Sequence, residues 1–260
     1  MLVLLAVISL AVSACGAAQK EVAAPGTTVG TEVDIPLPQR ILDLPFTDST
    51  GATVHLSDFA DHVVVLMPSM TLCQETCPLD TSQLVSVMHQ ANDGPLDATD
   101  SVVYLWVTVD PWRDDPAQLT AYRRQWAAAD ELPNWHLLTG KPAAVHALWK
   151  QLGVFVKKTK GDDDGVVRNW RTGAVLTFDV QHSDEVFFID GDGHERFILE
   201  GMPTFASTPS LPKKLAAFLS DEGRKNEGFK HGWTIPGAES VLSWLLDRPL
   251  PSASASANSG

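Results

Sequence analysis

Two long apolar runs constrain this chain more than any other feature of its sequence. Residues 62–67 (HVVVLM) and 102–109 (VVYLWVTV) are almost continuously apolar over the length of a strand. Such runs are typical of strands that are buried on both faces at the centre of a sheet. The segment between them, residues 78–91, carries apolar side chains at helical spacing, namely Leu79, Leu84, Val85, Val87 and Met88. A strand, a helix and a second buried strand predict an α/β domain.

The rest of the chain supplies further elements in a regular order. Asp115 followed by Pro116 indicates a helix start, because the carboxylate caps the first turn and proline needs no amide partner there. The other predicted elements are a hairpin over residues 46–56, strands over 135–138, 175–179, 185–190 and 196–199, a tight turn at 191–193, and helices over 142–152 and 211–219. This order predicts a thioredoxin-like α/β fold with an N-terminal β-hairpin.

Composition divides the chain into a folded part and flanking segments. Residues 16–37 are small, polar and broken by proline and glycine, so we expect a flexible tether. Residues 250–260 are of low complexity and are expected to form a disordered tail. The thioredoxin-like domain is placed at 38–222 and a C-terminal extension at 223–249. Residues 157–173 match no element and are predicted to form an exposed inserted loop.

The extension contains an apolar stretch over residues 234–246. We interpret this stretch as an additional amphipathic helix that packs on the domain. Contact with a membrane surface or a partner protein is the alternative, although the basic residues that favour a membrane surface are scarce there.

The N-terminal segment resembles the signal of an exported protein. Residues 1–14 are uncharged and almost wholly apolar, and they are too few to span a bilayer, which takes about 20 residues. Val12, Ser13 and Ala14 precede Cys15, and this sequence is similar to the lipobox of bacterial lipoproteins, in which the cysteine is acylated. We therefore predict a signal segment at 1–15 and a lipid anchor on Cys15, with the domain on the extracytoplasmic face of the cell membrane. A buried N-terminal strand or helix is the alternative.

If Cys15 carries lipid, Cys73 and Cys77 remain as one spaced pair of cysteines. Cys73 lies in the loop that leaves the first apolar run, and Cys77 lies at the start of the next helix, where the helix dipole is expected to lower the thiol pKa. Their spacing places both sulfurs on one side of a turn, which suits a disulfide, a metal site or alternation between the two. A stapling disulfide over so short a loop would stabilise little. Thr71, two residues before Cys73, does not match the peroxiredoxin spacing of three.

Three ordered segments resemble the Sco (SenC) family of copper-binding cytochrome c oxidase assembly proteins. They are residues 73–78 (CQETCP), 107–116 (VTVDPWRDDP) and 180–193 (VQHSDEVFFIDGDG). The resemblance implies that Cys73, Cys77 and His182 bind copper, as Cu(I) or Cu(II). Two thiolates and an imidazole are a soft ligand set that suits Cu(I), whereas structural zinc normally takes four protein ligands. Asp110 is expected either to support the metal site from behind the ligands or to cap its own loop.

The resemblance implies a copper chaperone for the CuA-bearing subunit of cytochrome c oxidase or for other copper proteins. The alternative is a thiol–disulfide oxidoreductase that reduces the cysteines of the target site with the same Cys73–Cys77 pair. A redox or copper sensor is a third interpretation. Nucleic acid is a poor partner for this chain, because its net charge of −13 repels phosphates.

Overall fold

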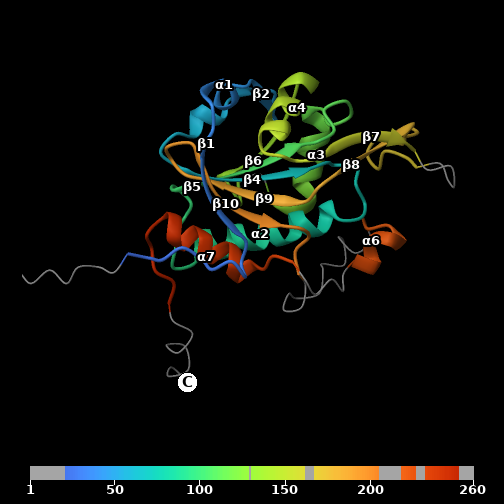
Figure 1. The fold of residues 1–260 in the computed structure, drawn as a ribbon. Coiled ribbons are helices and arrows are strands. Elements are labelled where there is room, and N and C mark those ends of the chain that lie inside the picture. The colour runs from blue at the N-terminus through green and yellow to red at the C-terminus, as the bar shows by residue number, and fades with distance from the viewer. Residues whose placement is uncertain (1–20, 129, 162–166, 205–217, 227–231, 252–260) are drawn as a thin grey trace, which may run out of the picture.

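The computed structural model describes residues 21–128, 130–161, 167–204, 218–226 and 232–251 (Figure 1). An eight-stranded sheet of order β1-β10-β9-β4-β5-β6-β2-β3 forms its centre, and β7 and β8 pair in a second sheet. The strands are β1 Thr31–Pro36, β2 Phe46–Asp48, β3 Thr53–Val54, β4 Val63–Ser69, β5 Val102–Thr108, β6 Trp135–Gly140, β7 Val156–Lys160, β8 Phe178–His182, β9 Glu185–Ile189 and β10 His194–Glu200. The helices are α1 Gln39–Leu42, α2 Cys77–Asp93, α3 Pro116–Trp126, α4 Pro142–Gln151, α6 Asp221–Asn226 and α7 Ile235–Leu245, with a 3-10 turn η1 at Leu56–Phe59.

The two apolar runs form the central strands of the large sheet, as predicted. β4 and β5 are parallel and pair from Val63 with Val102 to Ser69 with Thr108. Every residue of both strands is buried. Because their carboxyl ends lie at the same edge of the sheet, the loops that follow them start side by side. This edge carries the cysteine loop.

Each face of the sheet is covered by its own layer of helices (Figure 1). Val65 and Trp106 belong to a core shared with α2, α3 and α7, whereas Leu66 and Val107 belong to a core shared with α1 and α4. Successive side chains of a strand point to opposite faces, so a continuous apolar run is needed to fill both cores. Full burial of a side chain such as Leu66 stabilises the fold by roughly 1.5–3 kcal/mol.

Residues 31–36, which we assigned to the flexible tether, form the edge strand β1. The strand pairs antiparallel with β10, from Thr31 opposite Ile198 to Pro36 opposite His194. Its side chains are almost all exposed, so the strand leaves no apolar pattern in the sequence and is held by backbone hydrogen bonds. The approach is close at Gly30, where an added Cβ would lie 2.3 Å from the carbonyl oxygen of Ile198.

The predicted inserted loop at 157–173 is wrong in its first part. Residues 156–160 form β7, which pairs antiparallel with β8 from Val156 opposite His182 to Lys160 opposite Phe178. β8 itself begins at Phe178, later than the predicted strand at 175–179. The three lysines of β7 are exposed and its apolar content is low, so the segment has no alternating apolar pattern from which a strand could be predicted.

The apolar stretch of the C-terminal extension forms α7, as the packing interpretation predicted. Val241 and Leu242 are fully buried in the core that α7 shares with α2. The side chain of Thr234 caps the helix by accepting a hydrogen bond from the amide of Gly237. Within the described ranges, no helix is long and apolar enough to cross a bilayer. The signal segment with Cys15, most of the predicted helix at 211–219 and most of the predicted tail lie outside the described residues.

Candidate metal and thiol site

The two cysteines lie where the fold of the strand–helix unit predicted them. Cys73 is in the loop after β4 and is half-buried, and Cys77 is the first residue of α2 and is 1% exposed. Pro78 follows at the second helical position, where no backbone donor is needed. Both cysteines are free thiols.

His182 brings an imidazole to the buried cysteine from a distant part of the chain. It ends β8, and its Nε2 lies 3.5 Å from the Sγ of Cys77. Its Nδ1 lies 2.9 Å from the carbonyl oxygen of Ser183, which can only accept a hydrogen bond. The proton is therefore on Nδ1, and the lone pair of Nε2 faces the sulfur.

The separation of these two atoms is that of two ligands on one metal ion. Metal–sulfur and metal–nitrogen bonds of about 2.3 and 2.1 Å at a tetrahedral angle place sulfur and nitrogen roughly 3.5 Å apart. Among the described residues, no three His, Cys, Asp or Glu side chains are already arranged as a complete metal site. Cys73, which hydrogen-bonds to Cys77, is the third soft donor in reach.

The pKa of the Cys73 thiol is raised. A hydrogen bond with Cys77, burial and the charge of Cys77 raise this pKa well above its usual value. Backbone amides of Glu75 and Cys77 oppose this rise without cancelling it. The hydrogen bond between the two adjacent sulfurs and their burial raise the pKa more than the amides at the helix terminus lower it.

Two acidic side chains that sequence analysis missed lie next to His182. Asp184 Oδ1 is 3.5 Å from Nδ1 of His182. Asp80, one turn after Cys77 in α2, is 5% exposed; burial raises its pKa most, and the charge of Asp184 raises it further. Burial also raises the pKa of Asp184, while His182 opposes that rise. The sequence offered one signal for Asp184, namely its position two residues after His182.

A buried carboxylate fixes the start of the cysteine loop. Asp114 accepts hydrogen bonds from the hydroxyls of Thr71 (2.5 Å) and Thr108 (2.6 Å) and from the Thr71 amide (3.2 Å). Burial and the charge of nearby Asp110 raise the pKa of Asp114 to about 7. From the opposite side, Trp170 Nε1 donates to the Thr71 carbonyl oxygen at 2.8 Å.

A C-terminal strap, residues 218–223, contacts the peptide between the two cysteines. The amide of Ser220 donates to the carbonyl oxygen of Gln74 (2.8 Å), and Gln74 Nε2 donates to the carbonyl oxygen of Phe218 (3.2 Å). At Gly223 an added Cβ would lie 2.4 Å from the Gln74 carbonyl oxygen, so only glycine fits. Two hydrogen bonds and the close approach at Gly223 therefore hold the strap against Gln74.

Asp110 is held within its own turn. Its carboxylate is fully buried and bonds to the Arg113 side chain, and its carbonyl oxygen accepts from the Asp114 amide (3.0 Å). Arg113 in turn donates to the carbonyl oxygen of Phe178 in β8 at 2.6 Å. Asp110 thus closes its own turn, and Arg113 connects it to β8.

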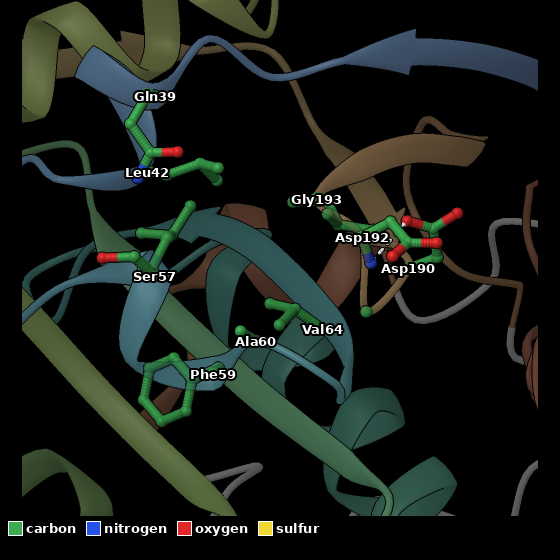
Figure 2. A pocket seen from close by; sticks show the side chains of 12 residues that line it. Gln39, Leu42, Ser57, Phe59, Ala60, Val64, Asp190, Asp192 and Gly193 are labelled. Carbon is green, nitrogen blue, oxygen red and sulfur yellow. Dashed lines mark hydrogen bonds between the residues drawn. The ribbon is translucent and has the colours of Figure 1, made fainter.

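A cavity of about 320 Å³ lies at the opposite end of the sheet from the cysteines (Figure 2). It opens between the start of β4 and the β9–β10 turn, and its wall includes Leu42, Leu56, Phe59, Val64, Gln39 and Asp190. The Asp190 carboxylate is already bonded to Arg196 and to the amides of its own turn. No sulfur or imidazole of the cysteine site lines this cavity.

The SCO1/SenC family model matches residues 41–201, more than half of the chain. The chain belongs to this family. The Sco family consists of cytochrome c oxidase assembly proteins. The matched range contains Cys73, Cys77 and His182, and it ends before the strap and α7.

Relatives and solved structures agree with this membership. "Protein SCO2 homolog, mitochondrial" of Danio rerio is 29% identical over 151 residues, which cover 58% of this chain and 48% of the relative, so the match spans about half of that protein. The apo Sco1 protein of Thermus thermophilus has a TM-score of 0.50 at 24% identity, over 73% of this chain and 90% of that chain. This likeness confirms the thioredoxin-like fold. ScoI of Arabidopsis thaliana, solved with copper bound, has a TM-score of 0.49 at 17% identity, over 66% of this chain and 88% of that chain.

Proposed function

We propose that this Sco-family chain is a copper chaperone that delivers copper to the CuA site of cytochrome c oxidase during assembly. The observation that carries the proposal is the approach of His182 Nε2 to Cys77 Sγ at 3.5 Å, across 105 residues of sequence. Two thiols and an imidazole with a free lone pair form a soft donor set that suits Cu(I) and, with one more ligand, Cu(II).

The residues perform the steps of loading and release as follows. Cys73 and Cys77 lose their thiol protons when they bind the ion, because thiolates are the metal ligands. His182 needs no proton release, since the carbonyl of Ser183 already holds the proton on Nδ1. On transfer, ligands of the recipient replace these three donors, and the thiols regain protons. The raised pKa of the Cys73 thiol favours its neutral form once the ion has left.

Copper titration of the purified protein tests the proposal. We expect one copper ion per chain, and we expect Cys73→Ala or Cys77→Ala to abolish loading and His182→Ala to weaken it. Ser69→Ala, a change at the end of β4 that removes no metal donor, is the control. Full loading of a protein that lacks both Cys73 and Cys77 contradicts the copper role.

Thiol–disulfide exchange with the target is a second candidate, and one observation favours it. Cys73 is half-buried and accessible, whereas Cys77 is buried behind it, the arrangement of an attacking and a resolving cysteine. Once it has lost its proton, Cys73 attacks a disulfide of the target, and Cys77 then displaces the reduced target and leaves a Cys73–Cys77 disulfide. Titration with thiol buffers followed by alkylation measures the pair; a pair that stays reduced under all of them contradicts this role.

A lipid on Cys15 is the proposed attachment to the extracytoplasmic face of the membrane. Because β1 begins at Thr31, the tether between Cys15 and the fold is limited to residues 16–30. Mass spectrometry of the mature N-terminus tests the anchor directly. Cys15→Ser is expected to release the protein from the membrane fraction or to leave the signal unprocessed, and an unmodified residue upstream of Cys15 in the membrane-bound form contradicts the lipid.

A further inference from the structure

Exposed large apolar side chains gather beside the histidine side of the site. Of the five in the described residues, all but Ile35 lie on one region: Trp112, Phe155, Val167 and Val175 are 45–55% exposed. Trp112 follows β5, and the other three lie on the arm, which we define as residues 154–182 including β7 and β8. Apolar side chains scattered singly are ordinary on a surface, but three on the arm together with Trp112 are typical of a contact surface.

Cations lie on the same surface. Lys158 Nζ is 3.6 Å from the ring centroid of Phe178 and 5.0 Å from that of Trp112, and the Arg113 guanidinium lies 4.1 Å from the Phe178 centroid. Lys157 and Lys160 are exposed. No described carboxylate forms an ion pair with any of the three lysines. Asp162, Asp163 and Asp164, in the same arm, lie outside the described residues.

This surface and His182, the proposed copper ligand, lie on the same pair of strands, β7 and β8. Val156 pairs with His182 and Lys158 with Val180, so Lys158, Phe178 and His182 lie on one face of the β7–β8 pair. Four residues along a strand separate Phe178 from His182 by roughly 13 Å. Phe155 is nearer, because its amide and carbonyl both bond to Ser183, at 3.0 and 3.1 Å. An interface of about 800 Å² per partner is roughly 30 Å across, so one footprint covers the ligand and the patch.

We infer that the surface formed by Trp112, Phe155, Phe178, Lys158 and Lys160 is where the copper-accepting protein docks, and that the acceptor presents carboxylates to it. The inference rests on the proposed copper delivery. Copper passes between proteins only when ligands of both reach the same ion, so the contact must surround the half-buried Cys73 and the strand end that carries His182. Aromatic and cationic side chains dominate the binding energy of protein interfaces.

Charge supplies the orientation of the docked complex. The chain has a net charge of −13, so an acidic acceptor is repelled by most of the surface and attracted at the exposed lysines. This favours encounters in which the acceptor faces the cysteines and His182. A membrane surface could also bind aromatic and basic side chains, but it offers no ligands to receive the ion.

The test measures copper transfer from the loaded full-length protein to the copper-free soluble CuA domain of the host oxidase. We expect the double change Lys158→Glu/Lys160→Glu to lower the second-order rate constant at least about tenfold at low salt, with the difference shrinking as salt rises. Trp112→Ala lowers the rate at all salt concentrations. Copper stoichiometry and the rate of release to a small copper chelator are unchanged in both. The matched control, Lys141→Glu/Lys150→Glu on α4, makes the same change of charge and transfers at a rate close to wild type.

The outcomes separate the two proposals. Transfer at the wild-type rate by both arm variants overturns the docking inference and leaves copper delivery standing. A wild-type protein that loads copper but passes none to the CuA domain overturns delivery and docking together. Anionic phospholipid vesicles are the second probe: binding that the Lys158→Glu/Lys160→Glu variant loses, with transfer unaffected, assigns the surface to the membrane and overturns the inference.

Discussion

The cysteine side and the histidine side of the site are held in different ways. The cysteine loop is fixed from three directions by buried hydrogen bonds, to Asp114, to Trp170 and to the strap at Ser220. His182 ends a two-stranded sheet in which half of the side chains are exposed. Buried, mutually supporting contacts cost more to open than exposed ones. The comparison indicates that the fold presets the position of the sulfurs and leaves the strands that carry His182 accessible to a partner.

The largest effect is expected from the carboxylate that holds the loop. At pH 5, below its pKa of about 7, Asp114→Ala removes the partner of the Thr71 and Thr108 hydroxyls and of the Thr71 amide. Leaving such buried donors without a partner costs on the order of 2–4 kcal/mol of unfolding free energy. Denaturant unfolding measures this cost. Asp100→Ala, at an exposed carboxylate, is the control, and equal stability of the two variants contradicts the rigid cysteine side.

The same carboxylate makes stability depend on pH. The folded-state pKa of Asp114, about 7, lies above the ordinary value of 3.8, so its contribution is fully present below about pH 4 and is lost as pH rises through 7. Asp114→Asn keeps the hydrogen-bonding shape and removes the titration. Between pH 4 and 7 the wild type is expected to lose stability relative to this variant by up to about 1.4 kcal/mol per pH unit. Parallel stability curves for the two proteins would show that Asp114 titrates normally.

The strap provides a test with a smaller expected effect. Gly223→Ala places a Cβ 2.4 Å from the Gln74 carbonyl oxygen and displaces the strap. Loss of about 1 kcal/mol of net hydrogen bonding raises the open population of the loop roughly fivefold, and with it the alkylation rate of Cys73. Gly26→Ala is the matched control, because an added Cβ there meets nothing within 4 Å. Equal alkylation rates would remove the strap from the contacts that hold the loop.

The smallest effect is expected on the histidine side. Lys158→Ala removes a cation from the face of Phe178, a contact worth about 0.5–1 kcal/mol at an exposed site. Thermal unfolding is therefore expected to change little, and the affinity for copper not at all. A loss as large as that of Asp114→Ala would mean that the arm is as firmly held as the cysteine loop, and the comparison between the two sides would fail.

Local patterns predicted the parts of the molecule that have local causes. The apolar runs became β4 and β5, Asp115 caps α3 through the amide of Gln118, and Cys77 is the first residue of α2. Local patterns did not predict the strands that depend on pairing with a distant part of the chain. β1 and β7 carry exposed side chains, and they are strands only because β10 and β8 supply their hydrogen bonds.

The α/β fold and the proposed ligand residues could be predicted from the sequence itself, because buried strands, helix starts and the three family motifs each lie within a short segment. Only the tertiary structure decided how those residues are held. Asp114 lies 43 residues from Thr71, Trp170 lies 99 residues away, and Phe218 lies 144 residues from Gln74. Contacts over such separations have no period or spacing in the sequence. The pKa of Cys73 is of the same kind: it is raised by the Cys77 sulfur, which the packed fold brings to it, and by burial.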